Sequence, residues 1–115
     1  MISLVSVHNE TMNIWSHLIA FFCVVGAAIA VLHEYDSTPV DYLGAVCMGV
    51  YLFSAAVCML LSSVYHWFCC VSTDAYFSLL KMDLSGVAIL IAGSFYPGVY
   101  YGRWELPYLP IVPFI

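Results

Sequence analysis

The chain has 115 residues, of which 64% are hydrophobic and only 8% are charged, and its formal net charge is −5. A soluble domain carries roughly 25% charged residues, and a chain this short cannot hide so much apolar side chain from water. The composition therefore excludes a soluble globular domain and predicts a membrane protein. Seven acidic residues against two basic ones also exclude a basic surface for nucleic acid.

The first predicted element is a membrane helix over residues 14–32, inside a long interval without charged residues. About 20 apolar residues suffice to cross the hydrocarbon core as a helix. The sequence entering this segment, residues 10–17, reads E-T-M-N-I-W-S-H. On a helix, Glu10, Asn13 and His17 would share one face. Two interpretations stay open for these residues: a helix cap with interfacial polar side chains, or part of a functional site.

The second predicted helix covers residues 42–68, and His66 lies near its end, one turn after Ser62. His66 is either an interfacial residue whose ring reaches the headgroups or a metal ligand, because neutral imidazole is a preferred zinc donor. Ser62 could fix the imidazole ring or hold a bound water. Cys69 and Cys70 follow the helix, and they either complete a ligand set or serve lipid attachment or interface packing.

The third predicted helix covers residues 79–101 and begins around K-M-D-L-S-G. Asp83 is either a helix N-terminal charge favoured by the helix dipole or a buried carboxylate, which needs a cation, a metal or hydrogen-bond donors to stay ionised. His66 with a metal would supply that partner. One histidine and one aspartate are too few for catalytic zinc, which generally takes three protein donors and a water.

Three consecutive spans alternate in direction across the membrane. The start of the first helix, the end of the second and the start of the third therefore share one face. Those are the places where the distinctive polar residues fall, which is the arrangement that a single intramembrane site needs.

The residues after Glu105 are too few to cross a bilayer, since ten residues with three prolines remain. They form either an interfacial tail or the start of a fourth helix over 105–115 that belongs to a longer protein. We favour the second interpretation.

Three motifs together resemble a known family. E-x-x-N-x-x-x-H over 10–17, S-x-x-x-H over 62–66 and the aspartate of K-M-D-L-S-G-V-A-I-L-I-A-G-S-F-Y-P over 81–97 resemble, in order and spacing, the progestin and adiponectin receptor family. That family includes bacterial haemolysin III-like proteins and is similar to alkaline ceramidases. The resemblance covers about residues 8–102.

The resemblance implies an all-α, polytopic membrane protein, in which residues 1–115 form the N-terminal part of a seven-helix bundle with a cytosolic N-terminus. It also implies a zinc ion near the cytosolic face. By that pattern His66 is a zinc ligand, Asp83 holds or activates a zinc-bound water, and Ser62 supports them. Two further histidines would lie on a last helix outside these residues. The supporting motif would comprise Glu10, Asn13 and His17.

The function implied is that of a receptor-like membrane protein for a hormone or lipid ligand, signalling through hydrolysis of a lipid such as ceramide. Two alternatives stay open: a zinc-dependent lipid amide hydrolase without a receptor role, and a haemolysin III-like membrane protein without enzymatic activity. The expected partners are membrane lipids, the ligand and further copies of the protein in an oligomer.

Overall fold

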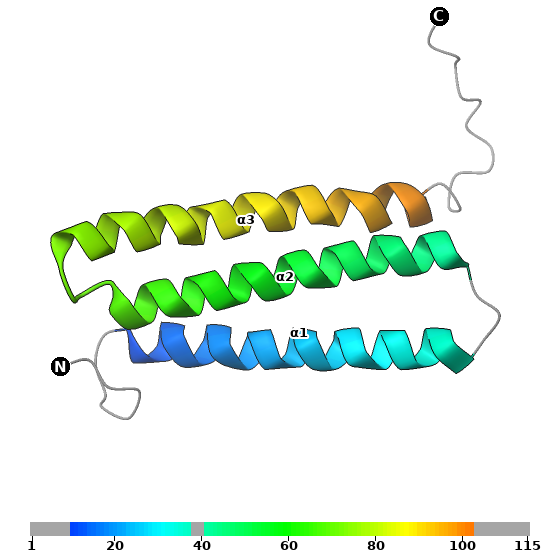
Figure 1. Ribbon diagram of the computed structural model, residues 1–115, viewed down its shortest axis with the longest axis horizontal. Coiled ribbons are helices and arrows are strands. Elements are labelled where there is room, and N and C mark those ends of the chain that lie inside the picture. The colour runs from blue at the N-terminus through cyan, green and yellow to red at the C-terminus, as the bar shows by residue number, and fades with distance from the viewer. Residues whose placement is uncertain (1–9, 38–40, 103–115) are drawn as a thin grey trace, which may run out of the picture.

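The computed structural model describes residues 10–37 and 41–102, which form three helices: α1 (Thr11–Ser37), α2 (Tyr42–Phe68) and α3 (Thr73–Gly102) (Figure 1). No strand occurs within these residues. Each helix contains a segment long and apolar enough to cross a membrane. The predicted all-α, membrane-spanning architecture is thereby confirmed for the part of the chain that the structure describes.

The bounds of α2 are those of the predicted segment, whereas α1 and α3 extend beyond the predicted segments 14–32 and 79–101. The helical hydrogen bonding continues past the apolar residues on which those segments were based. At the start of α3, the hydroxyl of Ser72 accepts a hydrogen bond of 3.1 Å from the backbone N–H of Ala75, so it caps the helix well before the apolar run begins. The predicted start of a fourth helix, 105–115, lies outside the described residues.

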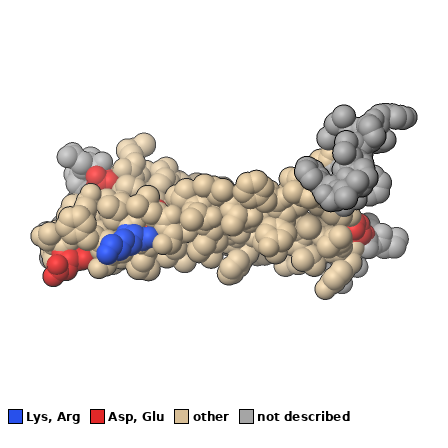
Figure 2. All heavy atoms as spheres, turned by 90° about the horizontal axis from the view of Figure 1, so that it is seen from above, with Lys and Arg blue, Asp and Glu red and all other residues tan. Residues whose placement is uncertain are grey.

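The three helices lie side by side in one layer, with α2 in the middle (Figure 1). α1 packs against α2 and α2 packs against α3, while α1 and α3 make no contact with each other within the described residues. Figure 2 shows that, on the face in view, charged side chains gather toward the two ends and leave an uncharged band between them. This distribution is the one that a bilayer requires of a spanning bundle.

Small residues allow α3 to approach α2 closely. A Cβ atom added to Gly93 would lie 2.0 Å from Oγ and 2.7 Å from Cβ of Ser54, and one added to Gly86 would lie 3.1 Å from Cα of Cys58. The Ser54 hydroxyl in turn donates a 2.6 Å hydrogen bond to the carbonyl of Val50 in its own helix, so it needs no partner from lipid. Close packing through small residues is typical of membrane helix pairs.

A polar contact joins α2 and α3 at the opposite end from the predicted site. The phenol of Tyr100, near the end of α3, donates a hydrogen bond to the carboxylate of Asp41, which directly precedes α2. This pair was not predicted from the sequence. It fixes the start of α2 against the end of α3.

Candidate functional site

The start of α1, the end of α2 and the start of α3 lie at the same end of the layer, as the alternation of the spans predicts (Figure 1). Two pairs of side chains from the predicted motifs meet there, each joining α1 to α2. Because α1 and α2 run in opposite directions, residues at the beginning of one meet residues at the end of the other.

The first pair joins Glu10 and His66. Oε2 of Glu10 lies 2.8 Å from Nδ1 of His66, a distance that makes the contact an ion pair when the imidazole is protonated. Nδ2 of Asn13 donates a 3.0 Å hydrogen bond to the same carboxylate oxygen. The carbonyl of Glu10 accepts the backbone N–H of Ile14, so the carboxylate stands at the N-terminus of α1, where the helix dipole favours a negative charge.

The second pair joins His17 and Ser62. Nδ1 of His17 lies 2.7 Å from the hydroxyl oxygen of Ser62, which is buried at 5% exposure. The imidazole rings of His17 and His66 meet edge to face with their centroids 5.5 Å apart, so the two pairs form one continuous cluster. The predicted Glu10–Asn13–His17 side of α1 thus faces α2.

Aromatic side chains pack around His66 as well. The ring of Tyr65 lies 4.9 Å from the His66 imidazole, and the ring of Tyr76 on α3 lies 5.8 Å from that of Tyr65, both measured between centroids. Neither tyrosine was predicted from the sequence to be part of the site. The signal available was the position of Tyr65 next to His66 within S-S-V-Y-H-W.

Asp83 lies apart from this cluster. It is half-buried on α3 and makes no hydrogen bond within the described part of the chain. Its carboxylate interacts electrostatically with the thiol of Cys58, which lies one turn before Ser62 on α2. The structure therefore brings Asp83 to the neighbouring turn of α2 but not into hydrogen-bond contact with His66.

Cys69 and Cys70 begin the connection between α2 and α3. Their sulfur atoms are 3.6 Å apart, and the Cys69 thiol lies 3.7 Å from the backbone carbonyl of His66. Burial, together with the neighbouring Cys70 and Glu10, which disfavour a second negative charge, raises the pKa of Cys69 to about 11.

These residues fit part of a zinc site. A zinc-binding histidine generally has its other ring nitrogen hydrogen-bonded to a carboxylate or carbonyl, as Nδ1 of His66 is to Glu10, which leaves Nε2 to face a metal. No three His, Cys, Asp or Glu side chains within residues 10–37 and 41–102 are arranged to hold a metal ion together. His66, Cys69 and Cys70 therefore do not make a ligand set among themselves. Further zinc ligands would have to come from outside residues 10–37 and 41–102.

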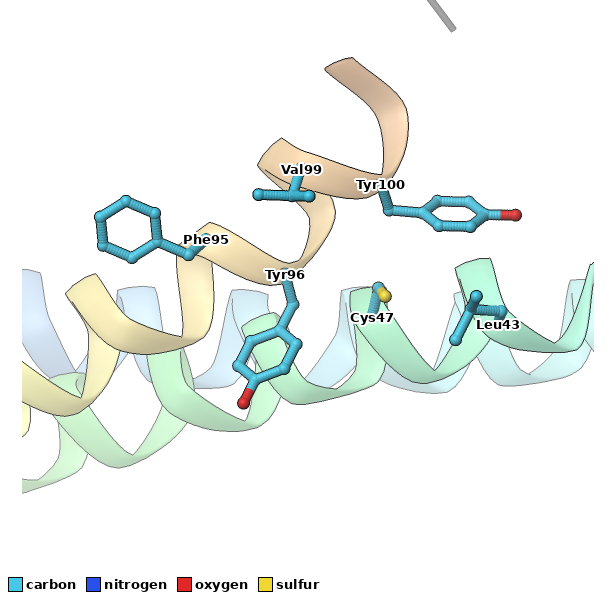
Figure 3. A pocket seen from close by; sticks show the side chains of 6 residues that line it. All are labelled: Leu43, Cys47, Phe95, Tyr96, Val99 and Tyr100. Carbon is cyan, nitrogen blue, oxygen red and sulfur yellow. The ribbon is translucent and has the colours of Figure 1, made fainter. Parts of the chain in front are cut away.

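A separate hollow lies between the start of α2 and the end of α3, and neither His17 nor His66 lines it (Figure 3). It has a volume of about 390 Å³ and is lined by Leu43, Cys47, Phe95, Tyr96, Val99 and Tyr100. A second, smaller hollow of about 280 Å³ separates parts of α1 and α2. Both have mostly apolar walls, and neither is lined by a histidine or a carboxylate.

The chain is similar in sequence to a known family of membrane proteins. A family model described as haemolysin-III related matches residues 5–114. The chain is 36% identical to heptahelical transmembrane protein 1 of Arabidopsis thaliana over 93% of its length, and 34% identical to the adiponectin receptor protein of Drosophila melanogaster over 87%. It is also 36% identical, over 93% of its length, to progestin and adipoQ receptor family member 3 of Homo sapiens.

The chain spans only part of these relatives: 36%, 22% and 37% of their respective lengths. No solved structure matches it.

Proposed function

The chain belongs to the haemolysin-III-related family of membrane proteins, which includes the adiponectin and progestin receptors, and from this membership we propose that it is part of a receptor-like protein with a zinc-dependent site. The site lies at the end of the helices where α1 and α2 exchange hydrogen bonds. The observation that carries the proposal is the Glu10–His66 contact, because a carboxylate on the far nitrogen of a histidine is typical of zinc sites.

His66 is the proposed zinc ligand, with its remaining partners on helices outside these 115 residues. Zinc, when bound, supplies a water of lowered pKa and polarises a substrate carbonyl. The described side chains position the imidazole of His66. Glu10 and the edge of His17 hold the imidazole of His66, and the buried hydroxyl of Ser62 keeps His17 in place.

Asp83 is the proposed proton acceptor. It is half-buried one helix away from the histidines and makes no hydrogen bond within the described residues, so its carboxylate oxygens are available to a substrate or to a water between α2 and α3. Hydrolysis of an amide bond in a lipid such as ceramide would use it as general base. The lipid substrate would approach from the bilayer that surrounds the spanning helices.

The receptor role and the hydrolase role are compatible, because a lipid product can itself carry the signal. A hormone or lipid ligand, an N-terminus in the cytosol and assembly into an oligomer are parts of the same proposal. The second candidate is a lipid amide hydrolase without a receptor role, and the feature that favours it is a cluster of polar side chains at one end of the spanning helices. The third is a haemolysin III-like membrane protein without enzymatic activity.

The zinc content of the purified protein tests whether His66 is a zinc ligand. We expect purified full-length wild-type protein to retain zinc through dialysis and the His66→Ala variant to lose it, while His33→Ala, at the other end of α1, retains it. Equal zinc stoichiometry in wild type and His66→Ala would refute the ligand assignment.

The rate of ceramide hydrolysis distinguishes the enzymatic candidates from the non-enzymatic one. We expect Asp83→Asn to keep its zinc and to lose ceramide hydrolysis, with Asp74→Asn, on the exposed first turn of α3, as the matched control. Hydrolysis that continues in Asp83→Asn would exclude the carboxylate as the base. Zinc binding without any hydrolysis in the wild type would favour the non-enzymatic alternative.

A further inference from the structure

We propose that Glu10 is a positioning residue that keeps a proton on Nδ1 of His66, so that Nε2 is the nitrogen offered to a ligand. This inference rests on the proposed function only in what Nε2 would bind. The placement of the proton is a property of the chain itself and can be measured without a metal.

The two partners of the histidines differ in what they can do. An ionised carboxylate only accepts hydrogen bonds, so the nitrogen that contacts Glu10 at 2.8 Å has to carry the hydrogen. A neutral imidazole has one N–H and one lone pair, which leaves the lone pair of His66 on Nε2. Ser62, in contrast, can either donate or accept, so its 2.7 Å contact leaves the tautomer of His17 open.

Asn13 supports the ionised form of Glu10. Its amide donates to Oε2 at 3.0 Å, the same oxygen that lies against His66. A hydrogen bond donated to a carboxylate oxygen favours the ionised form of the carboxyl group. The position of Glu10 at the start of α1, where its carbonyl receives the first helical N–H from Ile14, favours the negative charge as well.

Neighbouring rings hold the imidazole in this orientation. Tyr65 contacts it at 4.9 Å and His17 at 5.5 Å between centroids, and the exposed fraction of the His66 side chain is 18%. A ring flip would move Nδ1 away from the only acidic side chain that forms a salt bridge with it within the described residues. The contacts on α1 and α2 therefore select one tautomer and one ring orientation together.

The test is nitrogen NMR of the full chain, labelled with ¹⁵N-histidine and placed in lipid nanodiscs, with a chelator present so that no metal binds. The shifts of the two ring nitrogens and their couplings to the ring protons distinguish an imidazole protonated on Nδ1 from one protonated on Nε2. The signal of His66 among the four histidines is identified by its loss in His66→Gln.

We expect His66 to show the Nδ1–H pattern in wild type and to change to the Nε2–H pattern in Glu10→Ala. Glu10→Gln, which retains a carbonyl oxygen as acceptor, should restore the wild-type pattern. Asp74→Asn should leave the pattern unchanged, because this carboxylate stands on the first turn of α3. Ser62→Ala should alter the signals of His17 while His66 keeps its proton on Nδ1.

A wild-type His66 protonated on Nε2 would overturn the inference, as would an unchanged His66 pattern in Glu10→Ala. If Glu10→Ala does not fold, the wild-type spectrum still tests the inference, because an Nε2–H pattern of His66 there would overturn it. Loss of this orientation should also lower zinc affinity by about 10- to 100-fold in full-length Glu10→Ala. A correct tautomer in a protein that binds no zinc would refute the proposed function and leave the positioning role intact.

Discussion

Replacing Gly93 by alanine should separate α2 from α3. The added Cβ would lie 2.0 Å from Oγ of Ser54 and 2.7 Å from its Cβ, both far inside van der Waals contact. The hydroxyl can rotate away by giving up its hydrogen bond to Val50, but the Cβ of Ser54 is fixed to the helix backbone. The two helices therefore have to move apart to admit one methyl group.

The expected cost is about 1–3 kcal/mol, the range found for inserting a methyl-sized group into packed interiors. Gly98→Ala is the matched control, because a Cβ there meets nothing within 4 Å and the residue lies in the same helix. Both variants share the gain of about 0.5–1 kcal/mol from removing a helical glycine. That gain cancels in the comparison, so the difference between the two variants reports the clash with Ser54.

The assay is reversible unfolding in mixed micelles with increasing SDS, followed by circular dichroism. We expect a lower free energy of unfolding for Gly93→Ala than for Gly98→Ala, and a recovery when Ser54→Gly is added to Gly93→Ala. The recovery follows because the next nearest atom, the Val50 carbonyl oxygen, is 3.4 Å away. Equal stability of the two alanine variants would refute the described packing of α2 on α3.

Three further outcomes are expected. Ser62→Ala should lower the free energy of unfolding by about 1–3 kcal/mol, because it leaves His17 without its hydrogen-bond partner. Ser63→Ala should lower it less, since that hydroxyl contacts only the carbonyl of Met59 in its own helix. Equal losses in the two variants would contradict the pairing of α1 with α2. Tyr100→Phe should lower the thermal midpoint by removing the hydrogen bond that joins the start of α2 to the end of α3, and an unchanged midpoint would show that this bond contributes nothing. In a variant that retains only Cys69 of the adjacent pair, labelling by N-ethylmaleimide at pH 8 should be slower than for a thiol with the usual pKa near 9, because burial, the largest cause of the raised pKa, remains and the thiolate is the reactive form. A variant that retains only the exposed Cys70 provides the comparison, and equal rates would contradict the burial of Cys69.

The helices themselves could be predicted from the sequence because a bilayer imposes a minimum length on any apolar helix. Residues 42–68 match α2 for this reason. The ends of α1 and α3 could not be predicted from apolar runs, since backbone hydrogen bonding continues through polar residues. Ser72 shows this, because its cap starts α3 before the apolar segment does.

The candidate site was predictable in composition but not in pairing. The spacing of Glu10 and His17 placed them on one face of α1, and the alternation of spans placed that face near His66. The pairs that form depend on the rotation of α1 about its axis and on its position along α2. Neither quantity can be predicted from the spacing of the polar residues in the sequence. The same applies to Gly93 and Gly98, which look alike in the sequence although one of them lies against Ser54 and the other has no neighbour within 4 Å.

The central position of α2 has a consequence for evolution and for engineering. Every described contact between α1 and the remaining helices is a contact with α2, and the same holds for α3. Substitutions at Gly93 and at His17 should therefore combine additively, because their partners on α2, Ser54 and Ser62, are different residues. The two interfaces share Tyr65, whose ring contacts both His66 and Tyr76. The hydrogen-bonded histidines belong to the first interface and the glycine packing to the second. Selection can thus change the packing of α3 at Gly93 without changing the hydrogen bonds between α1 and α2. It can also change those hydrogen bonds without changing the packing at Gly93.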